Sequence, residues 1–137
     1  MISAKLFNTE EELQRIEEKF EKLGVNVHLC FESMFVCEVN DHITNESVCL
    51  VASLKQSSYE LKGYFLTEEK DYLIDCGIRM ILNYLYNLGN ETATFLFDCE
   101  EEVLEKSCKK IGLKHLNNVG NMVQYSLEAA VFYSSMC

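Results

Sequence analysis

The sequence contains no proline, no internal repeat and no low-complexity tract, so nothing in it marks a linker between domains. It also lacks any run close to the roughly 20 apolar residues that a membrane helix needs. The first residues are followed too soon by acidic ones to form a secretory signal. With 48% apolar and 25% charged residues, we expect one folded domain over residues 1–137, a cytoplasmic location and no membrane partner.

Basic residues are few. The chain has 12 Lys and Arg against 22 Asp and Glu, for a net charge of -10. A nucleic-acid backbone demands a basic face, so we expect no nucleic-acid partner. The acidic surface either provides solubility alone or attracts a cationic small molecule or a Lys-rich peptide.

The seven cysteines include no C-x-x-C pair, which excludes zinc-ribbon and thioredoxin-like sites. Most of them lie in apolar runs, where a free cysteine behaves as a small buried hydrophobe. His28, Cys30 and Cys37 form a weak metal constellation, for which packing in the core is the better explanation. We therefore expect no metal and no intramolecular disulfide.

The apolar spacing predicts a helix over residues 9–23. Thr9 and Glu12 form a capping box at its start, and Gly24 ends it. Residues 25–31, 34–39, 47–54 and 59–66 are rich in β-branched and aromatic side chains and are predicted to be strands. Short connections between these strands indicate an antiparallel meander.

A second helix, apolar on two sides, is predicted over residues 71–88, followed by a buried strand at 92–97. A helix at 100–111, closed by Gly112, and strands at 113–116 and 122–132 complete the chain. The order is βα, a meander, αβα and a hairpin. It predicts an α+β (α/β) fold with a mixed, mostly antiparallel sheet flanked by helices, in which strand 92–97 lies parallel to strand 59–66.

This order, from residue 34 onward, resembles the GNAT superfamily of N-acetyltransferases. The run Leu-Glu-Lys-Ser-Cys-Lys-Lys-Ile-Gly-Leu-Lys at 104–114 is similar to the family's late helix, which often ends in a Tyr-Glu-Lys-Leu-Gly-Phe type of run. The run Gly-Ile-Arg-Met-Ile-Leu at 77–82 resembles the start of its cofactor helix. The N-terminal third has one predicted helix where the family commonly has two. The resemblance implies a GNAT-like fold with acetyl-CoA as cofactor.

The stretch that corresponds to the family's glycine-rich phosphate loop is residues 67–79. Here it has one glycine and four carboxylates, which either cap the helix or surround a phosphate site. Backbone amides at the end of strand 59–66 would polarise the acyl carbonyl. The cofactor contacts that the resemblance implies are Phe65, Leu66, Lys70, Cys76, Gly77, Ile78 and Arg79.

Alignment on Gly112 places Cys108 where the family often has a Tyr that protonates the departing thiolate. Cys108 is either that acid or a buried helical cysteine. Glu60, on the strand before the loop, is the candidate base, and its alternative is an ordinary surface glutamate.

Three functions remain open from the sequence. The first is an acetyl-CoA-dependent N-acetyltransferase that acts on a small amine or a Lys side chain. The second is a catalytically inactive GNAT-like domain that binds a partner or forms a homodimer through the helix at 71–88. The third is an α+β domain of another topology, such as a small-ligand or regulatory domain.

Overall fold

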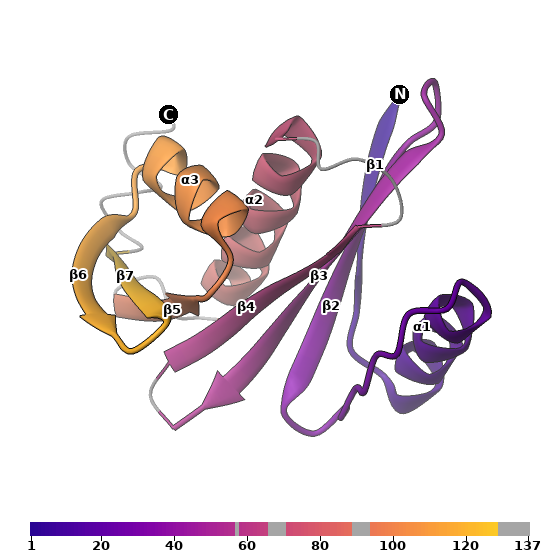
Figure 1. Cartoon of the computed structure of the whole chain (residues 1–137), viewed down its shortest axis with the longest axis horizontal. Helices are drawn as coiled ribbons and strands as arrows, with labels where there is room; N and C mark the ends of the chain where they lie inside the picture. Colours follow the sequence, from indigo (N-terminus) through magenta and orange to yellow (C-terminus); the bar gives the residue numbers. More distant parts are fainter. Residues whose placement is uncertain (57, 66–70, 89–93, 129–137) are drawn as a thin grey trace.

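The computed structural model describes residues 1–56, 58–65, 71–88 and 94–128 (Figure 1). The strands form one sheet in the order β1-β2-β3-β4-β5-β7-β6, in which β4 and β5 are parallel and the other described pairs are antiparallel. This confirms the predicted mixed α+β sheet. The elements are β1 (Ile2–Phe7), α1 (Glu10–Lys22), β2 (Met34–Asp41), β3 (Glu46–Lys55), β4 (Ser58–Phe65), α2 (Asp71–Asn87), β5 (Thr94–Cys99), α3 (Glu102–Ile111), β6 (Lys114–Val119) and β7 (Met122–Glu128).

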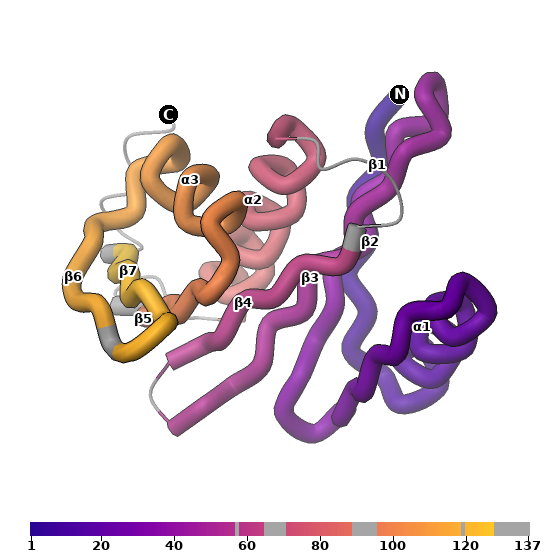
Figure 2. Tube along the Cα trace, in the orientation of Figure 1, coloured from indigo at the N-terminus to yellow at the C-terminus, as the bar shows by residue number. Residues whose placement is uncertain are grey.

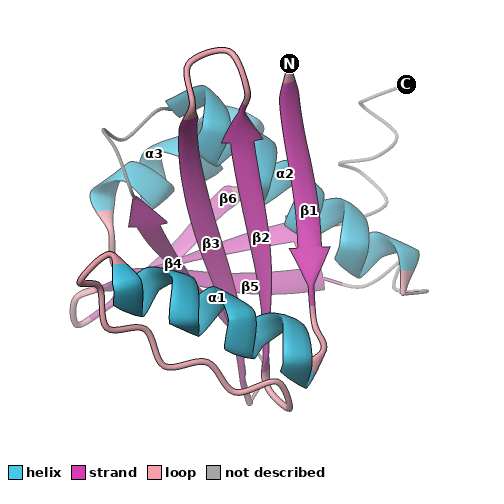
Figure 3. Cartoon of the chain, turned by 90° about the vertical axis from the view of Figure 1, so that its right-hand side faces the viewer, coloured by secondary structure: helices cyan, strands magenta, loops and turns pink. Residues whose placement is uncertain are grey.

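Helices cover both faces of the sheet. α1 lies across one face of β1–β3, and α2 and α3 lie on the opposite face (Figures 1 and 3). The larger core forms where the apolar side of α2 packs on β2 and β3, with Leu50, Ile74 and Ile78 almost fully buried. A smaller core forms under α1, where Phe20 packs with Val36 and other strand residues. The strand alternation therefore separates two buried layers.

The first helix forms as its sequence predicts. The Thr9 hydroxyl accepts a hydrogen bond from the Glu12 amide at 3.3 Å, and the Glu12 carboxylate accepts one from the Thr9 amide at 3.3 Å. Two of the amides that a helix start leaves unpaired are thereby satisfied. Gly24, at φ +80°, follows the end of the helix in the left-handed conformation that glycine adopts without strain.

The predicted strand at residues 25–31 is wrong. This segment is a loop that pairs with no strand in the described structure, and it packs along α1. Val27 is buried against the helix, and the Glu17 carboxylate accepts a hydrogen bond from the Leu29 amide at 2.5 Å. The alternating apolar pattern is therefore satisfied by a helix surface rather than by a sheet. The strand at the sheet edge is instead β1, for which the apolar pattern identified no residues.

The parallel crossover from β4 through α2 to β5 is confirmed. Tyr59 pairs with Phe97, Glu60 with Asp98 and Leu61 with Cys99. The helices predicted at 71–88 and 100–111 are observed within two residues of their expected ends. The last four residues of the strand predicted at 122–132 lie outside the described part of the chain.

The described cysteines are all free thiols. Cys37 lies in the core under α2, as expected, whereas His28 and Cys30 are exposed on the side of α1, so core packing was the wrong explanation for those two. Burial raises the pKa of the Cys37 thiol to about 12. Within the described residues, no group of three or more His, Cys, Asp or Glu is placed to hold a metal ion. No described helix is long and apolar enough to cross a membrane.

Candidate functional site

The sheet opens between β4 and β5. The two strands pair only over Tyr59–Leu61, because β5 ends at Cys99 and the chain turns into α3. β4 continues to Phe65. Figure 2 shows the tube of β4 running on away from β5. From Lys62 onward, the edge of β4 that faces β5 pairs with no strand of the described part of the chain. Such an edge presents backbone donors and acceptors to any extended group that lies along it.

One side chain of α3 reaches this open edge. The Gly63 amide donates to both carboxylate oxygens of Glu101, at 3.3 Å each. Glu101 is the N-cap residue of α3, but its side chain makes no capping hydrogen bond to its own helix. The edge amide of β4 is thus satisfied by a carboxylate from the helix that follows β5.

A cavity of about 270 Å³ lies between the start of α2 and one face of α3, lined by Asp71, Asp75, Lys106, Ser107 and Lys110. The Lys110 ammonium lies 3.0 Å from one carboxylate oxygen of Asp75. The other oxygen of Asp75 is buried and has no hydrogen-bond partner among the residues that the structure describes. The amides at the start of a helix attract anions, and the two lysines add positive charge to that end. Asp71 and Asp75 oppose it.

The predicted cofactor residues on α2 lie mainly in its packing face. Gly77 and Ile78 are buried against the sheet. A Cβ on Gly77 would lie 2.7 Å from Leu50 Cδ1 and 3.2 Å from Val39 Cγ2, so this glycine permits close packing of helix on sheet. Cys76 is half-buried against the same core, and Arg79 is exposed.

The other predicted cofactor residues are only partly visible. Phe65 is the last residue of β4, and no side-chain position is described for it. Leu66 and Lys70 lie outside the described residues. Lys106 and Lys110 of α3 line the cavity at the start of α2.

Glu60 lies on the opposite face of the sheet, three residues before Gly63. Its register partner on β5 is Asp98, and neighbouring strands place both side chains on one face. Asp98 accepts hydrogen bonds from the Ser58 hydroxyl at 2.6 Å and from the Gln124 amide at 3.3 Å. Two acidic residues therefore occupy neighbouring positions on one face of the sheet where β4 and β5 begin to part.

Cys108 lies in the interior. It is fully buried, and its sulfur is 3.8 Å from that of Cys99 on β5. The contact of Cys99 with Cys108, together with the burial of Cys99, raises the pKa of the Cys99 thiol far above its usual value. Cys108 packs between helix and sheet with no exposed surface, so its thiol has no access to a ligand whose thiolate it would protonate.

Glu101, Lys106, Lys110 and Asp98 were missed by sequence reasoning. The family resemblance concerns the glycine loop and the end of the late helix. These four residues come together only through the pairing of β4 with β5 and the packing of α3 beside α2. The register of β4 with β5 is the signal that identifies Glu101 and Asp98, because it places them opposite Gly63 and Glu60.

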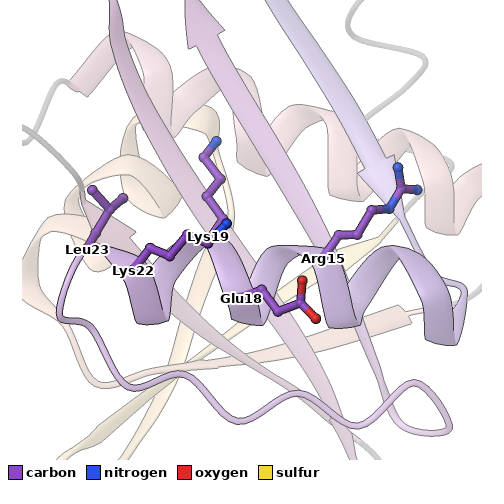
Figure 4. A pocket seen from close by; sticks show the side chains of 5 residues that line it. All are labelled: Arg15, Glu18, Lys19, Lys22 and Leu23. Atoms are coloured by element: carbon purple, nitrogen blue, oxygen red, sulfur yellow. The ribbon is translucent and has the colours of Figure 1, made fainter.

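A second recess, of about 390 Å³, lies along α1 and is lined by Arg15, Glu18, Lys19, Lys22 and Leu23 (Figure 4). All five side chains are exposed, and Lys19 is paired with Glu38 of β2 at 2.8 Å. No buried polar group faces this recess from the residues that line it. We interpret it as the solvated flank of an amphipathic helix.

No family model matches the chain, and no curated protein sequence matches it significantly. Solved structures do match. An N-acetyltransferase from Staphylococcus aureus superposes with a TM-score of 0.59 at 12% identity, covering 94% of this chain and 98% of that one. A spermidine N-acetyltransferase chimera, whose parent enzyme is from Vibrio cholerae, gives 0.57 at 11% identity, covering 97% and 99%.

A putative acetyltransferase from Sphaerobacter thermophilus gives a TM-score of 0.54 at 9% identity, covering 91% of this chain and 93% of that one. The similarity therefore extends over almost the whole length of each chain, including the parallel β4–β5 pair and the two helices beside it. At these identities it establishes architecture rather than chemistry. The chain has the fold of the GNAT superfamily of N-acetyltransferases.

Proposed function

We propose that the chain is an acetyl-CoA-dependent N-acetyltransferase that acts on a small amine or a Lys side chain. The observation that carries this proposal is the opening of the sheet after Leu61, where a single parallel strand pair ends and the β4 edge continues past it. The helix α3 takes part in both features, since its N-cap Glu101 contacts Gly63 at the gap and its Lys106 and Lys110 line the cavity at the start of α2. An edge amide and a cavity that carries lysines at a helix start are the two features that a long ligand with an amide chain and phosphates requires.

The described residues fit acetyl-CoA in position and in part of their charge. Lys106 and Lys110 would contact its phosphates at the start of α2, and the Gly63 amide would donate to a carbonyl oxygen in the gap. When bound, acetyl-CoA supplies the activated thioester. An amide fixed in the sheet stabilises negative charge on an oxygen without reorganisation, which is how an oxyanion hole acts.

The acceptor would approach from the face of the sheet that carries Glu60 and Asp98. Glu60 would take the proton of the attacking ammonium, directly or through water, and Asp98 would help to hold the positive charge. A net charge of -10 would favour the approach of a cation over longer distances. The spermidine acetyltransferase among the similar structures supports a small cationic amine as the acceptor class.

The test is acetyl transfer to a set of amines and a Lys peptide, followed by mass spectrometry, with CoA affinity measured by calorimetry. Replacing Lys106 and Lys110 together by Ala should weaken CoA binding by about tenfold or more, because each charged contact contributes about 1 kcal/mol or more. Lys109→Ala is the matched control, since Lys109 is an exposed lysine of the same helix that does not line the cavity.

Glu60→Gln should lower the transfer rate with little effect on CoA affinity, because it removes the base and leaves the cavity intact. Equal CoA affinity in the double Lys variant and in Lys109→Ala would contradict the phosphate assignment. If protein saturated with acetyl-CoA transfers acetyl groups to none of the amines, the proposed N-acetyltransferase activity is contradicted.

The second candidate is a partner-binding or dimerising domain without catalysis. It is favoured by the two carboxylates that already occupy the ligand positions, Glu101 on the Gly63 amide and Asp75 on Lys110. Sedimentation of the wild-type protein at several concentrations tests the homodimer directly. A monomer at every concentration would contradict that form of the hypothesis.

A further inference from the structure

The contact between Glu101 and Gly63 replaces a missing rung of the sheet. In the parallel register, Leu61 pairs with Cys99, so a further step of two residues would bring Gly63 opposite residue 101. The backbone has already turned into α3 at that point, and the amides of Leu104 and Glu105 donate to the Glu101 carbonyl at 3.1 Å each. The side chain of Glu101 therefore supplies the acceptor that its backbone no longer offers.

Gly63 is also the first position beyond the β5 pairing at which an extended ligand along this edge would meet an amide of β4. Gly63 has no side chain that could cover its amide, and this amide points to the edge of β4 that faces β5. While the carboxylate holds this amide, a ligand in the gap meets a negative charge and finds the donor already used. The ligand must displace Glu101 or bind without the edge amide.

We propose that Glu101 is the specificity-determining residue of the gap, an internal competitor that a ligand must displace from the Gly63 amide. The inference rests on the proposed function, because it concerns the same gap. Displacement favours a ligand that offers a neutral amide or thioester carbonyl, since a ligand carboxylate would be repelled by Glu101 nearby.

The released carboxylate has a second place to bind. Glu101 is the N-cap of α3, and its side chain makes no hydrogen bond to that helix while it contacts Gly63. After release it can turn to the amides of the first turn of α3, where the helix dipole favours a negative charge. Because the Glu101 carboxylate can exchange one set of amide donors for another, its displacement from Gly63 has a moderate free-energy cost.

The experiment titrates CoA itself into the full chain by calorimetry, for the wild type, Glu101→Ala and Glu101→Gln. Glu102→Gln is the matched control, because Glu102 is the adjacent, exposed glutamate and loses the same charge. Glu101→Ala should raise CoA affinity by about tenfold, as expected when a charge-assisted hydrogen bond stops competing. Glu101→Gln should give a smaller gain, because its amide oxygen can still accept from Gly63, and Glu102→Gln should change affinity by about twofold or less.

Hydrogen exchange of the Gly63 amide provides a readout that needs no ligand. The amide should exchange at least about tenfold faster in Glu101→Ala than in the wild type and in Glu102→Gln. Equal hydrogen-exchange rates of the Gly63 amide in all three proteins would overturn its hydrogen bonds to Glu101. Equal CoA affinity in the wild type and Glu101→Ala, or no CoA binding by either, would overturn the competition.

The proposed function is judged separately, by acetyl transfer. Tighter CoA binding in Glu101→Ala without any transfer to amines would support the competitor and refute the enzyme. Acetyl transfer by the wild type, with an unchanged CoA affinity in Glu101→Ala, would support the enzyme and refute the competitor. If Glu101→Ala does not fold, Glu101→Gln carries both measurements.

Discussion

Replacement of Gly77 by Ala tests how α2 is seated on the sheet. The new Cβ would lie 2.7 Å from Leu50 Cδ1 and 3.2 Å from Val39 Cγ2. Both neighbours are buried, at 1% and 0% exposure, so neither side chain can move into solvent. Overpacking of a core costs about 1–3 kcal/mol. Ala in place of Gly inside a helix returns about 1 kcal/mol.

The packing cost is therefore expected to exceed the helix gain, and Gly77→Ala should lower the free energy of unfolding by about 1 kcal/mol. Denaturant unfolding of wild type and variant measures this. The control is the same substitution with Leu50→Val, which removes the atom that the new Cβ meets. In that background Gly77→Ala should be neutral or stabilising by up to about 1 kcal/mol, so the two changes should couple strongly.

Two results would refute this account. If Gly77→Ala stabilises the otherwise unchanged protein, Leu50 yields without cost and the close approach is unimportant. If Gly77→Ala leaves the free energy of unfolding unchanged but weakens CoA binding, the glycine serves a ligand, as the family resemblance implied, and not the helix–sheet contact.

Three further predictions concern single contacts. Thr9→Ala should lower the free energy of unfolding by about 1 kcal/mol in denaturant titrations, while Thr9→Ser, which keeps the capping oxygen, should stay near the wild type, and equal losses would contradict the cap. Hydrogen bonds from the Tyr72 hydroxyl and the backbone lower the pKa of Asp41 to about 2, below its unfolded value near 3.9, so this stability is present above about pH 4 and is lost as pH falls through about 2. Unfolding curves from pH 5 to pH 2 should show a smaller loss in Tyr72→Phe, and parallel losses would exclude the contact. In native protein a thiol reagent should modify exposed Cys30 much faster than buried Cys37, as peptide mapping by mass spectrometry can show, and comparable rates would contradict the packing of β2.

Local patterns predicted the elements whose signals are local. The capping box at Thr9 and the glycine at Gly24 mark the ends of α1 because each acts within one turn of the chain. The apolar face of α2 identifies a buried helix for the same reason. The apolar run at 95–97 identifies the strand β5 but not its burial, because Phe97 and Cys99 are buried whereas Leu96 is only half-buried. The parallel pairing of β4 with β5 then follows from the handedness of the crossover.

The segment at 25–31 shows where a local pattern is ambiguous. Alternating apolar residues indicate an extended chain with one buried side, but they do not tell whether a strand or a helix covers that side. Here the covering surface is α1, and the Leu29 amide is satisfied by the Glu17 side chain instead of by a neighbouring strand. The burial of one side was predictable, and the element that covers it was not.

The site was less predictable because its residues meet through pairing register. Glu60 was identified from its place on the strand before the loop, but its neighbour Asp98 follows only from the β4–β5 alignment. Gly77 was assigned to the cofactor since glycines commonly serve phosphate loops, yet close packing against Leu50 requires a glycine equally well. One residue type thus answers two physical demands that the sequence does not separate.

The internal contacts bear on whether the chain is an enzyme or a binding domain. Lys110 is 69% exposed, so its pair with Asp75 contributes about 1 kcal/mol or less. The hydrogen bonds from Gly63 to Glu101 are long, at 3.3 Å each, and the carboxylate has the start of α3 as an alternative. A ligand with a phosphate for Lys110 and a carbonyl for Gly63 would replace each contact with one of the same kind. The carboxylates of Asp75 and Glu101 should therefore lower the affinity for such a ligand without closing the site. For this reason we favour a weakly binding acetyltransferase over a domain that no longer binds a ligand.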